Sequence, residues 1–420
     1  GEHSLPEIAR LARAGRSVAE APGVLSREGG RARMLGGPAP RADLDVLPMP
    51  DYDEYFYARR ESGYDAAHPD AGAMLPIETS RGCWWGRRRH CIFCGLHRPG
   101  DGYRVVPASR TLDMLESLAG RYRTRRFFAI DNIMPVEYLE EVFDPLASRR
   151  SDFKFHYNIR PTLNRDQLRR LKMGGIRSVQ PGVESLSTTL LRLLGKGCTA
   201  RSNVELLKWT TYFGIRNLYN LLTHVPGETA ADYDEQARVI RMIPHFQPPV
   251  QLARVRADRG SPMYCHPERF MIGDFRPHPA YAHLFPPGRF DPRKVAYFHD
   301  YTAGVVLPEA VYAGLEGAVG RWKSLWQRPA QPTLRYFKRL DSLLVEDRRG
   351  NEPREYTLAG TAARLYEACA EARRPKRLGE LCNLPVGEVD QILGELVQAE
   401  LVLLIDGYFL SLALPVNRDH

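Results

Sequence analysis

The sequence predicts an α/β protein, in which a partial, open (β/α)6 barrel is followed by a small winged-helix-like α+β domain. Between residues 74 and 255, six short apolar segments alternate with helix-forming stretches, which is typical of parallel βαβ units. Near the carboxyl end, three helical stretches precede two apolar runs that flank Asp406-Gly407, a strong hairpin signal. Six strands are too few for a closed eight-stranded barrel, so we expect an open one.

Polar residues follow each expected strand. The strands should span residues 74–78, 126–131, 153–158, 178–184, 217–222 and 250–255, with helices over 110–122 and 136–147 in the first crossovers. Barrels carry their chemistry at the carboxyl ends of the strands, so these residues should line one cavity, although each alone would also suit a helix cap. The set is Cys83, Asp131, Asn132, Asn158, Arg160, Glu184, Ser185, His224, Arg254 and Arg256.

One loop after the first strand concentrates the reactive side chains. Three of the seven cysteines, Cys83, Cys91 and Cys94, lie there with the spacing C-x7-C-x2-C. Three thiolates leave a coordination shell incomplete. His90 or His97 would complete a four-ligand zinc site, whereas an iron–sulfur cubane on three cysteines keeps one iron open for a small molecule. The spacing by itself leaves zinc, a cluster and unliganded thiols as alternatives.

The neighbours of these cysteines resemble those of the radical S-adenosylmethionine (SAM) enzymes. An apolar strand runs into the loop, and Phe93 lies between the last two cysteines. The usual spacing in that family is C-x3-C-x2-C. The longer first gap, with Arg-Gly-Cys-Trp-Trp-Gly at 81–86 and Cys-x-Phe-Cys-Gly-Leu at 91–96, is similar to a subgroup of peptide-maturation radical SAM C-methyltransferases.

The resemblance implies a [4Fe-4S] cluster on Cys83, Cys91 and Cys94 that reductively cleaves SAM to a 5'-deoxyadenosyl radical. It also implies cobalamin-dependent C-methylation of a ribosomally synthesised (RiPP) precursor peptide, with flavodoxin or ferredoxin as electron donor. Two alternatives remain. One is another cobalamin-family radical enzyme acting on a small natural product, and the other is a zinc-containing nucleic-acid-binding protein.

The same resemblance assigns residues to SAM, which needs an acceptor for its ammonium group, a cation for its carboxylate and partners for the ribose hydroxyls. Phe93 would lie near the adenine. Asp131 and Asn132 would meet the amino group. Asn158 or Arg160 would bind the ribose or the carboxylate of SAM. Glu184, which is followed by Ser185, would bind the ribose or the amino group.

Four regions are expected along the chain. Residues 1–73 should be a remnant of a cobalamin-binding domain with its linker, because Gly1-Glu2 begins as if in mid-domain and resembles the close of that domain. Residues 74–263 should form the barrel, 264–355 a cover and connector, and 356–420 the winged helix. No Asp-x-His-x-x-Gly cobalamin motif is present, so we expect cobalamin only in the full-length protein.

The third helix of the carboxyl-terminal domain argues against DNA binding. Between Pro385 and Glu400 the chain carries four acids and no basic residue, whereas a recognition helix needs Arg or Lys towards the phosphates. Two readings remain for this domain. An exposed hairpin edge could accept a precursor peptide as an added strand, or the domain could simply pack against the barrel.

Composition and charge indicate a cellular location but hardly restrict the binding partners. The net charge of +9, from 59 basic and 50 acidic residues, suits nucleic acid, an acidic peptide or anionic cofactors equally. No apolar run approaches the ~20 residues needed to cross a bilayer, and no signal peptide is visible. Clustered cysteines favour a reducing compartment. We therefore expect a cytoplasmic enzyme without a membrane partner.

Overall fold

The computed structural model describes residues 1–68, 72–96, 102–285, 288–304 and 307–416. The chain divides into two compact units, residues 1–73 with 104–124, and residues 74–103 with 125–420. The second unit holds the barrel and everything that follows it. No helix in the described ranges is both long enough and apolar enough to span a membrane.

The first unit is built mainly from short helices and one hairpin. Tyr122 ties its parts together, because its ring stacks on Phe56 with centroids 5.0 Å apart and its hydroxyl accepts a hydrogen bond from the Tyr52 amide at 2.7 Å. The expected helix over 110–122 is present as α5. The elements are α1 (Ser4–Arg13), η1 (Val18–Glu20), β1 (Ser26–Glu28), β2 (Arg31–Arg33), η2 (Leu44–Val46), α2 (Asp53–Glu61), α3 (Tyr64–Ala67), β5 (Arg104–Val105) and α5 (Ala108–Tyr122).

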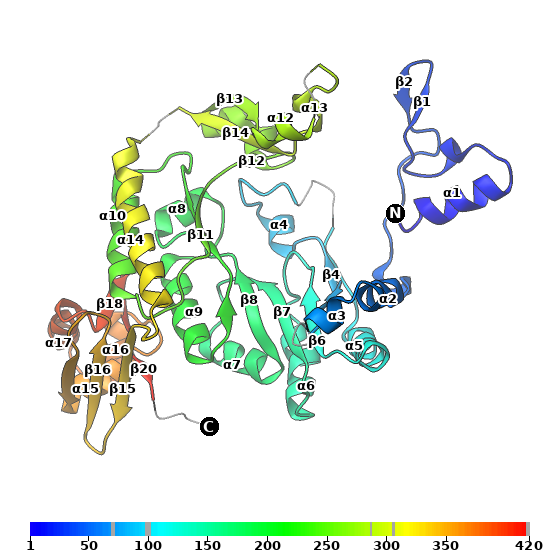
Figure 1. Ribbon diagram of the computed structural model, residues 1–420. Helices are drawn as coiled ribbons and strands as arrows, with labels where there is room; N and C mark the ends of the chain where they lie inside the picture. The colour runs from blue at the N-terminus through cyan, green and yellow to red at the C-terminus, as the bar shows by residue number, and fades with distance from the viewer. Residues whose placement is uncertain (69–71, 97–101, 286–287, 305–306, 417–420) are drawn as a thin grey trace. The chain divides into compact units, whose positions relative to one another are not determined.

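The second unit contains the expected parallel strands (Figure 1). Five strands form one parallel sheet in chain order, and β10 pairs in parallel with β11. A bridge from Glu184 to Leu221 links the two groups, and no strand closes the barrel within the described ranges. The strands are β3 (Leu75–Ile77), β6 (Arg126–Ala129), β7 (Lys154–Ile159), β8 (Ile176–Pro181), β9 (Arg216–Asn217), β10 (Asn220–Thr223) and β11 (Gln251–Arg254). The predicted α/β class with an open parallel barrel is confirmed, although the fifth strand is split at Leu218-Tyr219.

Helices follow the strands as the alternation predicts, and several begin at side-chain caps. Asn164 and Thr199 cap α7 and α9 in capping boxes. Thr229, in the Pro-Gly-Glu-Thr turn after β10, begins α10, where its amide donates to Asp232 at 3.0 Å. That turn is therefore an ordinary strand-to-helix connection. The helices are α4 (Trp84–Arg88), η3 (Leu139–Phe143), α6 (Asp144–Ser148), α7 (Arg165–Met173), α8 (Thr188–Leu193), α9 (Ala200–Tyr212) and α10 (Ala230–Met242).

A small antiparallel sheet and a long helix follow the barrel. Strand β14 lies between β12 and β13, and α14 runs beside α10 (Figure 1). The buried carboxylate of Glu228 fixes this packing, because it accepts hydrogen bonds from the hydroxyls of Tyr233 on α10 and Tyr312 on α14. The elements are β12 (Ala257–Asp258), α11 (Pro262–Cys265), η4 (Pro267–Phe270), β13 (Ile272–Pro277), α12 (Ala280–Leu284), α13 (Pro292–Val295), β14 (Phe298–Ala303) and α14 (Glu309–Gln327).

The carboxyl-terminal module has the three helices and the hairpin that the sequence predicts. Asp406 and Gly407 both adopt positive φ, 54° and 75°, as a tight hairpin turn requires. The expected boundary at 355/356 falls inside β17, which pairs with β16, so the sheet and the helices are continuous. The elements are β15 (Thr333–Lys338), β16 (Ser342–Arg348), β17 (Arg354–Ala359), α15 (Gly360–Ala368), α16 (Pro375–Cys382), α17 (Val386–Gln398), β18 (Val402–Ile405), β19 (Tyr408–Ser411) and β20 (Leu414–Pro415).

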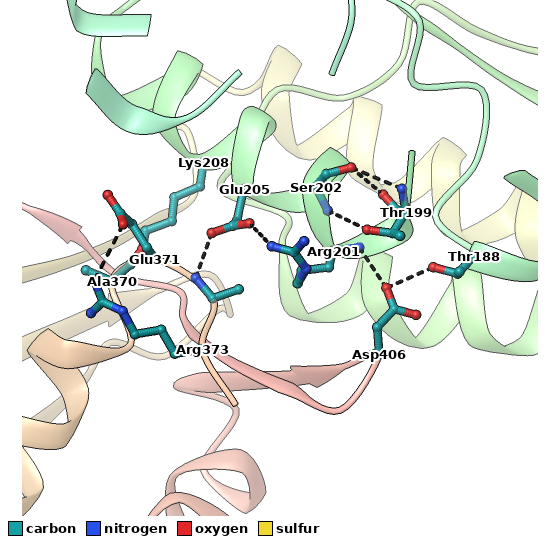
Figure 2. A network of polar contacts seen from close by, with 11 residues as sticks. Thr188, Thr199, Arg201, Ser202, Glu205, Lys208, Ala370, Glu371, Arg373 and Asp406 are labelled. Atoms are coloured by element: carbon teal, nitrogen blue, oxygen red, sulfur yellow. Dashed lines mark hydrogen bonds and ion pairs between the residues drawn. The ribbon is translucent and has the colours of Figure 1, made fainter. Parts of the chain in front are cut away.

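Helix α9 of the barrel binds this module through polar contacts (Figure 2). Lys208 donates to the carbonyls of Ala370 and Ser411 at 2.7 and 2.6 Å, and Glu205 accepts from the Ala372 amide at 2.6 Å. Asp406 at the hairpin turn accepts from Thr188 Oγ1 at 2.8 Å.

The outer edge of strand β19 is also occupied by the chain itself. The amide of Arg373 donates to the Phe409 carbonyl at 3.1 Å, and the Phe409 amide donates back at 2.9 Å. The Ser411 amide bonds the Cys369 carbonyl at 2.9 Å. Strand addition by a peptide at this edge would have to displace these bonds. These bonds within the module therefore argue against peptide docking at this edge.

Candidate active site

A cavity of about 270 Å³ opens at the carboxyl ends of the barrel strands. Small-molecule sites commonly enclose about 300–1,000 Å³, so it lies near the size of a small cofactor site. All three cysteines of the loop line it, and the rings of Trp85 and Phe93 form apolar wall. The polar side chains on the wall, besides the thiols, are His90, Asn132, Asn158, Arg160, Gln180, Glu184, Lys196, Tyr219 and Asn220.

The cysteine loop is held by bonds to the rest of the barrel. The Ile92 amide donates to the Leu194 carbonyl at 3.1 Å, and the Met263 amide to the Ile92 carbonyl at 2.9 Å. Gly82, just before the first cysteine, has φ of 92°, and a Cβ there would lie 2.4 Å from the Gly102 carbonyl oxygen. Only glycine fits such a position without strain. The protein itself therefore shapes the loop.

The three thiols have different local environments. Cys83 Sγ accepts from the Gly86 amide at 3.4 Å. Burial raises the pKa of Cys91, against the lowering effect of nearby Lys196, and burial also raises the pKa of Cys94. Burial therefore disfavours the thiolate forms of Cys91 and Cys94, and metal binding would release their protons.

The arrangement of the three cysteines helps to distinguish a single metal ion from an iron–sulfur cluster. In the part of the chain that the structure describes, no three His, Cys, Asp or Glu side chains gather closely enough to hold a single ion. A cubane binds each thiolate at a different iron, so its ligands face a shared cavity rather than one point. Three cysteines on the wall of one cavity fit that requirement. Of the two histidines that could complete a zinc site, His90 shares the cavity wall with the cysteines, and His97 lies outside the described residues.

Five of the seven residues assigned to SAM share this cavity, namely Phe93, Asn132, Asn158, Arg160 and Glu184. Asn158 donates its Nδ2 to the Asp131 carbonyl at 2.7 Å, while its buried Oδ1 has no hydrogen-bond partner among the described residues. A buried acceptor without a partner is costly. Asn158 therefore presents a free acceptor at the cavity wall.

Arg160 and Glu184 are fixed by Trp85 on α4 and by Lys196 in the turn after α8. The guanidinium of Arg160 lies 4.0 Å from the centre of the Trp85 ring and donates to the Lys196 carbonyl, and burial lowers its pKa. Glu184 pairs with Lys196 Nζ at 3.1 Å and adopts a left-handed backbone with φ of 58°. The cavity wall thus carries one acid, Glu184, and two cations, Arg160 and Lys196.

Asp131 and Ser185 lie outside the cavity wall. Asp131, 1% exposed, accepts from the Thr79 amide at 2.8 Å, Thr79 Oγ1 at 2.5 Å and Ser80 Oγ at 2.8 Å. Burial raises its pKa to about 6, against these hydrogen bonds. Ser185 donates to Gln236 Oε1 at 2.9 Å. Their contacts hold backbone that carries site residues, and they do not support contact with SAM.

The polar residues after the last two strands are also outside the cavity wall. His224 stacks on Tyr312 with ring centroids 4.0 Å apart. Arg256 lies 4.2 Å from the centre of the Phe298 ring, and Arg254 is exposed at the end of β11. The rule that every strand end faces one cavity therefore fails at β10 and β11.

Sequence reasoning missed Lys196, Gln180 and Asn220. Lys196 follows a helix instead of a strand, so its place in the chain gave no reason to include it. A usable signal was its position between Gly195 and Gly197, which both have positive φ, at 69° and 62°. A charged residue between two such glycines sits on a tight turn.

An open parallel barrel with three cysteines on the wall of a cavity at its strand ends fits a protein that holds an iron–sulfur cluster. The sequence agrees, because residues 77–240 match the profile described as Radical SAM superfamily. This part of the chain is a radical SAM domain.

Known proteins similar to the chain include methyltransferases. It is 23% identical over 238 residues to the uncharacterized methyltransferase PH0819 of Pyrococcus horikoshii, covering 56% of this chain and 50% of that protein. It superposes on the cobalamin-dependent SAM radical enzyme OxsB with aqua-cobalamin bound, at a TM-score of 0.55 and 14% identity, over 77% of this chain and 55% of OxsB.

A second solved structure gives a similar result. TsrM from Kitasatospora setae, a radical SAM methyltransferase with cobalamin and a [4Fe-4S] cluster bound, superposes at a TM-score of 0.54 and 17% identity, over 76% of this chain and 67% of TsrM. At these identities the likeness to OxsB and TsrM concerns the fold. The chain spans about half the length of PH0819 and of OxsB.

Proposed function

We propose that Cys83, Cys91 and Cys94 hold a [4Fe-4S] cluster and that the protein reductively cleaves SAM. The observation that carries this is the presence of all three thiols on one cavity with an unpartnered acceptor, an acid and two cations. When bound, the cluster supplies the electron that breaks the sulfur–C5' bond of SAM. The protein binds SAM, orients it and excludes water.

Different cavity residues would bind different groups of SAM. Phe93 offers a ring to the adenine. The free Asn158 Oδ1 and the Glu184 carboxylate are acceptors for the ribose hydroxyls or the ammonium, and Asn132 is a further partner for the amino group. Arg160 and Lys196 are the cations available to the carboxylate.

The radical formed from SAM would serve C-methylation through cobalamin in the full-length protein. PH0819 is named a methyltransferase, and OxsB and TsrM were solved with cobalamin. We propose a ribosomally synthesised precursor peptide as substrate, an electron donor of the flavodoxin or ferredoxin kind, and a cytoplasmic location. Residues 1–420 alone should then bind the cluster and SAM but fail to retain cobalamin.

The cluster assignment is tested by anaerobic reconstitution with iron and sulfide, followed by assay for 5'-deoxyadenosine. The chain should take up about four irons and form 5'-deoxyadenosine under a low-potential reductant. Cys83→Ala should lose this activity, while Cys265→Ala, at an exposed thiol away from the cavity wall, should retain it. One zinc and no iron, or an active Cys83→Ala, would overturn the proposal.

A small natural product is the second candidate substrate. TsrM was also solved with its tryptophan substrate, so one protein of this fold accepts a free amino acid. Mass spectrometry after incubation with methyl-labelled SAM, cobalamin and the full-length protein separates the two. Label on a precursor peptide supports the first, and label only on free small molecules supports the second.

A further inference from the structure

The seven residues between Cys83 and Cys91 form a two-sided element. Helix α4 occupies most of this gap, and its Trp85 faces the barrel. Trp85 Nε1 donates to the Gly195 carbonyl at 3.1 Å, and a Cβ on Gly197 would lie 2.0 Å from the Trp85 ring. This close packing fixes the inner side of the element against the turn that carries Lys196.

Three consecutive arginines lie near the end of this element. Arg87, Arg88 and Arg89 are all exposed, and none forms an ion pair with any residue that the structure describes. The one acid between residues 78 and 95, Glu78, is already paired with Arg81 at 2.6 Å. Among the described residues, these three positive charges therefore have no ion-pair partner.

These charges lie close to the proposed cluster for a simple covalent reason. Arg89 is two residues from Cys91 and Arg87 four residues from Cys83. At most about 3.6 Å of chain per residue separates them, so their Cα atoms lie within roughly 7 and 14 Å of a cluster ligand. A carrier docked on this row would be brought next to the cysteine loop.

We propose that Arg87, Arg88 and Arg89 form the docking surface for an acidic protein that carries single electrons. The proposal rests on the cluster assignment above. In each event the carrier is oxidised by one electron and the cluster is reduced by one, with no bond made or broken between the two proteins. Unpaired cations attract an acidic partner at long range and raise its encounter rate.

The test compares two reductants on the reconstituted triple variant R87Q/R88Q/R89Q. With reduced flavodoxin at low salt, 5'-deoxyadenosine formation should fall roughly tenfold or more, within the range that steering supplies. With reduced methyl viologen, a small cation that needs no docking, the rate should stay within about twofold of the parent. Rising ionic strength should slow the flavodoxin-driven parent and leave the variant nearly unchanged.

A matched control removes three exposed arginines elsewhere, as R328Q/R335Q/R364Q. It carries the same change in net charge and should keep the parent rate with both reductants. Iron content and the cluster's electron paramagnetic resonance signal check that both triple variants hold the cluster.

Three outcomes would overturn the docking surface. Equal loss with both reductants would place the arginines in the fold or the cluster site. No loss with either would make them a solvated surface. An unchanged flavodoxin-driven rate with a raised KM for an acidic precursor peptide would make this a substrate surface. A parent that forms no 5'-deoxyadenosine even with methyl viologen would instead refute the proposed function.

Discussion

Two buried lysines, Lys196 in the cavity and Lys208 in the joint between α9 and the carboxyl-terminal module, have opposite protonation behaviour. They are 8% and 0% exposed, so burial opposes the charge on both. Lys196 Nζ lies 3.1 Å from a Glu184 carboxylate oxygen, and this acid with the nearby thiols outweighs burial and raises its pKa. Lys208 contacts the carbonyls of Ala370 and Ser411, and burial lowers its pKa to about 7, against the effect of Glu205.

The difference teaches what each site needs. The cavity keeps a fixed positive charge beside Cys91, which suits a site that receives an anionic cluster and a carboxylate. The joint needs donors more than charge, and a neutral amine still has two N–H groups for two carbonyls. The two lysines are buried to nearly the same depth, so the charge of the partner determines whether the pKa of the lysine rises or falls.

The largest expected effect comes from removing the partner acid. Glu184→Gln leaves the charge of Lys196 buried without compensation, which should cost about 3 kcal/mol of unfolding free energy. Urea unfolding of the anaerobically purified chain measures it. The double variant Glu184→Gln/Lys196→Met should recover at least half of the loss. A cost below about 1 kcal/mol, the level of a surface pair, would mean that Lys196 does not depend on Glu184.

The second effect concerns the joint. Lys208→Met keeps the apolar stem but leaves two buried carbonyls without a donor, which should cost about 2 kcal/mol. Lys172→Met is the control, because Lys172 donates to a single carbonyl, that of Gly214, at a half-buried position. The control should change stability by less than about 0.5 kcal/mol. Equal losses of unfolding free energy in the two variants would show that Lys208 is no more important to stability than Lys172.

The pH dependence of stability sharpens the comparison further. The pKa of Lys208 falls from its ordinary 10.5 to about 7 on folding, so between these values the unfolded chain binds a proton that the folded chain does not. Stability should therefore rise with pH in that window, by at most about 1.4 kcal/mol per pH unit, and the penalty is complete below pH 7. Urea unfolding between pH 7 and 9 should show a flatter slope in Lys208→Met. An identical slope would mean that Lys208 stays charged in the fold.

The sequence predicted the strands better than the side-chain contacts, for physical reasons. Apolar segments with helices between them are a local pattern, so all six strands and the carboxyl-terminal helices could be placed. The partners of Asp131, Thr79 and Ser80, lie about fifty residues earlier in the chain and are joined only by folding. No local pattern shows whether a carboxylate at a strand end faces a ligand or a backbone amide.

The cavity was predicted in part for the same reason. Residues at or just past the carboxyl ends of β7 and β8 follow the strand rule, and Asn158, Arg160 and Glu184 all line the cavity. Lys196 reaches it from a turn after a helix, and Tyr219 reaches it where the fifth strand breaks. Both positions depend on packing between elements, which the order of strands does not encode.

The smallest expected effect tests whether the module is also held at its hairpin. Asp406 accepts from Thr188 Oγ1 at 2.8 Å and from the Arg201 amide at 3.2 Å, but it is exposed, so water can replace both bonds. Asp406→Gly keeps the positive φ of the turn and removes the acceptor, and should cost about 1 kcal/mol or less. Asp406→Asn keeps one acceptor oxygen and should cost less than the glycine variant. A loss in Asp406→Gly larger than in Lys208→Met would show that the exposed turn, and not the buried amine, holds the module to the barrel.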